Sequence, residues 1–77
     1  PEHAIHPGWI WVPLDLRDQQ GIAILAGITT TTPGTLSVDL TPDRSHLLVH
    51  CFHLDDAAST IADIKQRYEG PLMEIYP

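Results

Sequence analysis

Five histidines and one cysteine are the residues in this sequence whose types could support metal binding or nucleophilic catalysis. Zinc requires ligand atoms that all lie about 2 Å from the metal. His46 and His50 share one face of a predicted strand, but at about 3.3 Å per residue they lie about 13 Å apart, and His53 points to the opposite face. His3 and His6 belong to a segment without apolar periodicity. The spacing predicts no metal site and no cofactor.

Cys51 stands in the middle of the same predicted strand, between His50 and Phe52. Neighbouring strand residues point to opposite faces, so His50 cannot act as the base for this thiol, and we expect Cys51 to be buried and inert. The aspartates fall at predicted caps, turns and strand edges, where local hydrogen bonds explain them. Pro33-Gly34-Thr35 lacks the Gly-Lys-Ser/Thr sequence of a phosphate-binding loop. We therefore predict no catalytic residue and no enzyme activity.

Composition narrows the classes of partner. The 77 residues include 4 Lys+Arg and 10 Asp+Glu, a net charge of −6. This balance leaves no basic surface for nucleic acid or for an anionic membrane leaflet. An apolar fraction of 43% is typical of a folded domain, and a single cysteine excludes an internal disulfide. No apolar stretch reaches the roughly 20 residues that cross a bilayer.

The N-terminal third is predicted to contain an arm and a first strand. Residues 1–8 carry two prolines and a glycine without apolar periodicity, which indicates a linker or arm before one soluble domain over residues 9–77. Apolar residues alternate from Trp9 to Leu16, a pattern typical of a strand. Pro13 cannot donate a hydrogen bond to a neighbouring strand, so this strand is expected at a sheet edge.

A helix and a second strand are predicted next. Asp18 is a suitable N-cap, and the helix should end near Gly27, because the β-branched threonines 29–32 favour leaving a helix. Pro33-Gly34 predicts a turn, and clean alternation over Thr35–Leu40 predicts a strand.

The C-terminal half is predicted to form a hairpin and a second helix. The turn 41–44 has proline at a favoured position and should join the second strand to a third over 46–54. Both faces of this third strand look apolar, which indicates a central strand or a face covered by another chain. A helix starting at Asp55 or Asp56 should end at Gly70-Pro71, with Lys65 turned away from its apolar side. The order β-α-β-β-α predicts an α+β fold, a small two-layer sandwich of a three-stranded mixed sheet and two helices.

The positions of two tryptophans and one histidine allow further predictions about their surroundings. Trp9 and Trp11 share one strand face, where they would either sit at a membrane boundary or pack against a helix. His50 lies among apolar neighbours, so we expect a partly buried imidazole that is hydrogen-bonded to a strand carbonyl or to a threonine of residues 29–32.

A set of short motifs runs through the chain from Val12 to Glu69. These motifs are Val12-Pro13-Leu14, Leu25-Ala26, the block ITTTTPGTLSVD over 28–39, Leu48-Val49-His50 and Tyr68-Glu69. As a set they resemble the soluble C-terminal part of the E subunit of multisubunit sodium/proton (Mrp-type) antiporters. Gly27, where the family usually has asparagine, and the uniform threonines 30–32 depart from the family pattern.

The resemblance implies an accessory, assembly-stabilising domain of a sodium/proton antiporter, with no ion pathway of its own. It also implies a transmembrane region preceding Pro1, a place on the cytoplasmic side of the cell membrane, and other antiporter subunits as partners, while the isolated piece could form a homo-oligomer. The structural or subunit-interface candidates are Pro33, Gly34, Thr35, His50, Trp9 and Trp11. The alternative is a free-standing ligand-binding or homo-oligomeric α+β domain, which the sequence upstream of Pro1 would distinguish.

Overall fold

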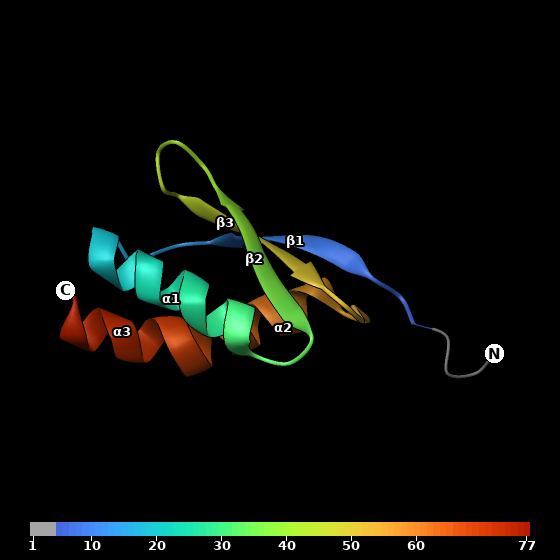
Figure 1. Ribbon diagram of the computed structural model, residues 1–77. Helices are drawn as coiled ribbons and strands as arrows, with labels where there is room; N and C mark the ends of the chain where they lie inside the picture. Colours follow the sequence, from blue (N-terminus) through green and yellow to red (C-terminus); the bar gives the residue numbers. More distant parts are fainter. Residues whose placement is uncertain (1–4) are drawn as a thin grey trace.

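Three strands and two helical segments make up the fold in a computed structural model that describes residues 5–77 (Figure 1). In chain order the elements are β1 (Gly8–Pro13), α1 (Gln19–Thr31), β2 (Thr35–Leu40), β3 (His46–Cys51), α2 (Ala57–Ile64), the π-helical segment η1 (Lys65–Glu69) and α3 (Gly70–Ile75). The last three form one continuous helical rod. The predicted order β-α-β-β-α is therefore confirmed, as is the α+β fold class.

The sheet has the strand order β1-β3-β2, and β3 is antiparallel to both of its neighbours. The prediction of a mixed sheet is wrong in this detail. β1 and β2, which the helix α1 connects, run in the same direction, but β3 lies between them, so no parallel ladder forms. The expected edge position of β1 and central position of β3 are both confirmed.

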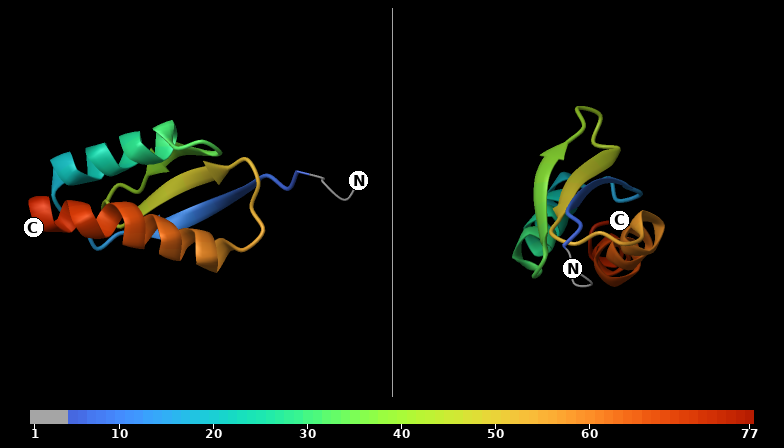
Figure 2. Two further views of the ribbon diagram at one scale, coloured as in Figure 1. Left: turned by 90° about the horizontal axis from the view of Figure 1, so that it is seen from below. Right: turned by 90° about the vertical axis from the view of Figure 1, so that its right-hand side faces the viewer.

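Both helical segments cover the same face of the sheet, as the two views of Figure 2 show. The core lies between this face and the helices. Alternate residues of β1 and of the following loop share one side, as their pattern predicted, and this side points into the core. Alternate residues of β3 point into it as well. The buried apolar side chains are Ile10, Val12, Leu14, Leu16, Ile22, Leu25, Leu47, Val49, Cys51, Ile64 and Leu72.

Helix α1 begins as predicted and ends later than predicted. The Asp18 carboxylate accepts a hydrogen bond from the Gly21 amide at 3.0 Å, the expected N-cap contact. The helix continues past Gly27 to Thr31. Hydroxyls of the threonines donate to helix carbonyls one turn back; the Thr29 hydroxyl, for example, bonds the Leu25 carbonyl at 3.1 Å. These bonds, together with burial of Thr29 against the sheet, offset the weak helix propensity of the threonines.

The second helical segment also begins as predicted, at an Asp56 cap, but it does not stop at Gly70-Pro71. In η1 the Gly70 amide donates to the carbonyl of Lys65, five residues back. The wider π turn comes directly before Pro71, which has no amide hydrogen to donate and would crowd a regular helix. The rod therefore continues to Ile75, and α3 packs Leu72 into the core.

The register of β2 shifts between Ser37 and Asp39. This irregularity places Val38 on the exposed side with Leu36 and turns Leu40 inward, opposite Leu47, so the three residues do not share a face as their alternation predicted. At the outer edge of β2, the Ser37 amide donates to the Thr30 hydroxyl at 3.2 Å.

Two turns set the directions of β2 and β3. One joins α1 to β2, and the other joins β2 to β3 in the hairpin. Gly34 has φ of 92°, a conformation that favours glycine, and it completes the turn that Pro33-Gly34 predicted. In the hairpin the Arg44 amide donates to the Thr41 carbonyl at 2.8 Å. Hydrogen bonds from Ser45 and then from Thr41 lower the pKa of the exposed Asp43 carboxyl to about 2.

Candidate functional site

The sheet face opposite the helices carries exposed apolar side chains from β1, from β2 and from Phe52, the residue that follows β3. We call this surface the outer face. Trp9 and Phe52 are each 59% exposed, and Trp11, Leu36 and Val38 are each 49% exposed. The helices described in residues 5–77 cover the other face of the sheet (Figure 2), and both tryptophans are exposed, so the interpretation that they pack against a helix is wrong. A contiguous apolar patch on a small domain indicates a binding surface.

His50 lies at the centre of the outer face, in one cross-strand row with Trp9 and Leu36. Its ring meets the Trp9 indole edge-on, with 4.7 Å between ring centroids. The side chain is half-buried, but within residues 5–77 no hydrogen bond to its ring is formed, so the predicted bond to a threonine or a strand carbonyl is wrong. Thr29 lies in α1 on the other side of the sheet, and the Thr35 hydroxyl points to that side, where it bonds the Thr29 carbonyl at 2.5 Å.

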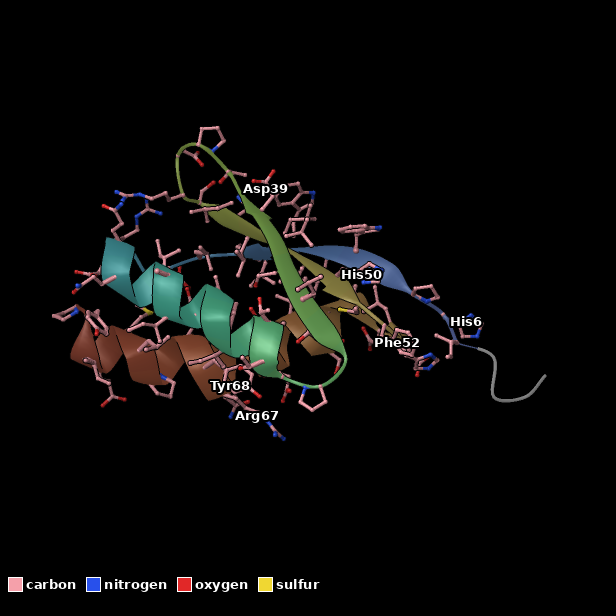
Figure 3. The ribbon with its side chains drawn as sticks, in the orientation of Figure 1. His6, Asp39, His50, Phe52, Arg67 and Tyr68 are labelled. Atoms are coloured by element: carbon pink, nitrogen blue, oxygen red, sulfur yellow. The ribbon has the colours of Figure 1, made fainter. Side chains whose placement is uncertain are left out.

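A shallow depression of about 330 Å³ opens beside His50. Figure 3 shows His50 and Phe52 toward one end of the sheet and Asp39 toward the hairpin end. The residues lining the depression are Gly34, Thr35, Leu36, His50 and Phe52. Such a hollow has room for one large apolar side chain of a partner.

Five of the six interface candidates from the sequence contribute to this surface. Trp9, Trp11 and His50 lie on the outer face, and Gly34 and Thr35 line the depression, whereas Pro33 lies in the adjacent turn and lines neither. Leu36, Val38 and Phe52 also lie on this surface but were not among the residues predicted from the sequence. The apolar side of β2 was visible in its alternation, but residue pattern alone does not say which face of a sheet the helices cover.

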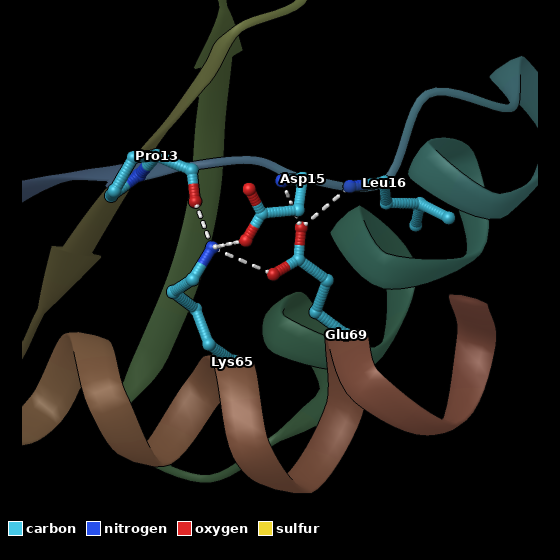
Figure 4. Close-up of polar contacts among 5 residues, drawn as sticks. All are labelled: Pro13, Asp15, Leu16, Lys65 and Glu69. Atoms are coloured by element: carbon cyan, nitrogen blue, oxygen red, sulfur yellow. Dashed lines mark hydrogen bonds and ion pairs between the residues drawn. The ribbon is translucent and has the colours of Figure 1, made fainter. Parts of the chain in front are cut away.

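A second cluster, the Glu69 clamp, ties the helical rod to the end of β1 (Figure 4). The Glu69 side chain is 2% exposed. One carboxylate oxygen accepts hydrogen bonds from the backbone amides of Asp15 at 2.7 Å and Leu16 at 2.9 Å. The other accepts from the Lys65 ammonium at 2.8 Å. The buried charge is thus fully hydrogen-bonded, as buried carboxylates require.

Lys65 completes the clamp, which corrects the prediction that this residue turns away from the fold. Its ammonium also donates to the Pro13 carbonyl at 2.5 Å and lies 3.0 Å from the Asp15 carboxylate. Burial alone would lower the pKa of Lys65, but hydrogen bonds and charges from Glu69 and Asp15 outweigh it and raise the pKa above its ordinary value.

The raised pKa of Lys65 predicts an alkaline limit to the stability of the fold. The charged ammonium should stabilise the folded state fully below the unfolded pKa of about 10.4, and this contribution should disappear as pH rises through the higher folded pKa. We expect the difference in unfolding free energy between wild type and Lys65→Met to be constant from pH 8 to about 10 and to shrink above. Urea unfolding at each pH measures it; a difference that stays constant to pH 12 would contradict the assignment.

The remaining chemistry-bearing residues are dispersed. The His53 ring accepts the His6 amide at 3.0 Å and lies 3.0 Å from the Asp55 carboxylate, which ties His6 to the loop after β3. Cys51 is buried, and burial raises the pKa of its thiol. Within residues 5–77 no three histidine, cysteine or acidic side chains meet as metal ligands. His3 lies outside the described residues.

Known proteins resemble this chain both in sequence and in structure. A family model described as Na+/H+ ion antiporter subunit matches residues 1–75. The E subunit of the Na(+)/H(+) antiporter of Bacillus subtilis is 33% identical over 75 residues, which are 97% of this chain and 48% of that protein. The counterpart of Alkalihalophilus pseudofirmus is 31% identical with the same coverage. The E subunit of a probable K(+)/H(+) antiporter of Rhizobium meliloti is 32% identical over 94% of this chain and 44% of that protein.

A solved structure of the Mrp complex from Dietzia sp. contains a chain with the same fold. It is 25% identical, has a TM-score of 0.80, and is matched over 100% of this chain and 74% of its own length. The chain spans about half the length of the curated relatives named above, and no helix in residues 5–77 is both long and apolar enough to cross a membrane. The match over residues 1–75 and these relatives confirm the resemblance read from the motifs: the chain belongs to the family of Na+/H+ antiporter E subunits.

Proposed function

We propose that this chain is an accessory, assembly-stabilising domain of a membrane cation/proton antiporter complex and that it provides no ion pathway of its own. The observation that carries the proposal is the outer face, where apolar side chains of β1, of β2 and of Phe52 after β3 lie exposed on one side of a small sheet. Exposed apolar patches of this kind are typical of surfaces that another protein covers. The named relatives are subunits of Na(+)/H(+) or K(+)/H(+) antiporters, which supplies the class of complex.

The location of the domain follows from the same proposal. A transmembrane region elsewhere in the subunit would hold the domain at the cell membrane, on the cytoplasmic side, with sodium as the transported cation. The outer face would contact another subunit, and the Glu69 clamp would keep the helical rod fixed to the sheet while that contact forms.

Deletion of residues 1–77 from the full-length subunit tests the proposal. We expect the purified complex to lose other subunits and, in parallel, sodium-driven proton flux in proteoliposomes, because the domain contributes contact surface and not conduction. Normal subunit content with abolished flux would contradict it.

A matched pair of point variants localises the effect. Trp11→Glu places a charge on the outer face, whereas Ile24→Glu places one on the exposed side of α1, where Ile24 is 39% exposed. Only the first variant should reduce subunit content. Equal effects of the two variants would show that the outer face is not the contact surface.

A further inference from the structure

From the outer face we infer the chemistry of its partner. The partner is a short amphipathic helix of another subunit, with an apolar stripe and with a lysine or arginine that faces Asp39 of this chain. This inference rests on the proposed function and specifies the partner of the same surface. It follows from the dimensions, area and charge of the face.

The dimensions of the outer face match about two turns of helix. Its side chains form two rows, Trp9–His50–Leu36 and, two residues along the strands, Trp11–Leu48–Asp39. The rows lie about 7 Å apart, and three strands span about 10 Å. Two helical turns are about 11 Å long. A helix with apolar residues three and four apart would cover both rows and place one large side chain in the depression beside His50.

The area of the face is sufficient for a contact with another protein. The exposed parts of its three aromatic and two aliphatic side chains amount to roughly 500 Å². A stable pair of independent proteins buries about 800 Å² on each partner, of which roughly 450 Å² is apolar. Charge disfavours a second copy of this chain as the occupant, since each copy carries a net charge of −6.

The charge of the face selects between protein and lipid. Asp39 is the only Asp, Glu, Lys or Arg in β1, β2 and β3, and it lies at the hairpin end of the outer face (Figure 3). The chain as a whole carries a net charge of −6, which disfavours contact with an anionic leaflet. The Asp39 carboxylate accepts a hydrogen bond from the Leu40 amide at 2.8 Å. A basic residue opposite Asp39 would add an interaction with its negative charge, while the apolar side of the same partner helix covers the two rows.

Photo-crosslinking in the assembled complex tests the inference. The full-length subunit would carry p-benzoyl-phenylalanine in place of Trp11 or, as control, in place of Ile24 on the exposed side of α1. We expect the Trp11 position to crosslink to an apolar, lysine- or arginine-containing helical peptide of another subunit, and the Ile24 position to give background only. Crosslinks from Trp11 to a second copy of this chain, to lipid alone, or at the same yield as from Ile24 would overturn the inference.

Charge reversal at Asp39 provides the second readout. With the probe at Trp11, Asp39→Lys should lower the crosslink yield about tenfold, because two like charges would then face each other. Glu74→Lys makes the same charge change at an exposed residue of α3 and should leave the yield unchanged. Equal yields in the two variants would refute the basic residue.

The two proposals fail differently. A complex that assembles and transports normally after deletion of residues 1–77 refutes the assembly function. A complex that needs the domain, but in which the Trp11 probe reaches no other subunit, refutes only the partner inferred for the outer face.

Discussion

Glu69→Ala is expected to lower the free energy of unfolding by about 3–5 kcal/mol, the range for removing one partner of a buried charge pair. The alanine would leave the backbone amides of Asp15 and Leu16 without their acceptor and would remove the closest carboxylate from Lys65. Small domains have total stabilities of about 5–15 kcal/mol, so this loss is a large fraction of the total. Chemical denaturation of the purified chain, followed by circular dichroism, measures the loss.

The control for this variant is Glu74→Ala, which removes an exposed carboxylate five residues further along the same rod. It should change stability by about 0.5 kcal/mol or less. Glu69→Gln should be less severe than Glu69→Ala, because its amide oxygen can still accept from the backbone. If Glu69→Ala and Glu74→Ala unfold at the same denaturant concentration, the clamp contributes nothing to the fold.

Leu25→Ala is expected to cost about 2–5 kcal/mol, because a cavity would form in the middle of the only core that the described residues share. Leu25 is 0% exposed and faces the sheet from α1. Its neighbour Ile24 is 39% exposed on the other side of the same helix, so Ile24→Ala should change stability by only about 0.5 kcal/mol.

The unfolding temperatures of the two variants compare a buried position with an exposed one, since the substitutions are adjacent and remove side chains of similar size. Leu25→Ala should unfold at a markedly lower temperature than Ile24→Ala. The reverse order would mean that α1 presents its other side to the sheet and that the face opposite the helices has been misidentified.

Local patterns were sufficient to predict the order of elements and several of their ends. Asp18 and Asp56 cap helices because a side-chain oxygen satisfies amides that the helix itself cannot, which depends only on nearby residues. The alternation from Trp9 to Leu16 likewise identified a strand, which the structure has as Gly8–Pro13. These features need no information from distant parts of the chain.

The errors occur where a distant contact decides the local structure. Thr29 stays helical because it is buried against β2, and Lys65 turns inward because the end of β1 offers oxygen atoms. Pro71 continues a helix because a π turn precedes it, which helix-stop rules do not include. For the candidate site, the tryptophans and His50 were recognisable by residue type, but their exposure depended on which face the helices cover.

The Thr30 hydroxyl bound to the Ser37 amide has a consequence for how the domain avoids self-association during synthesis. β2 is an outer strand, and the unpaired amides of such strands can recruit strands of other molecules and begin aggregation. The Thr30 hydroxyl accepts a hydrogen bond from one of these amides. The register shift between Ser37 and Asp39 interrupts the regular spacing of backbone groups that an added strand would need. A newly synthesised subunit can therefore keep an apolar sheet face exposed for its partner without also exposing a regular edge strand to which strands of other molecules would add.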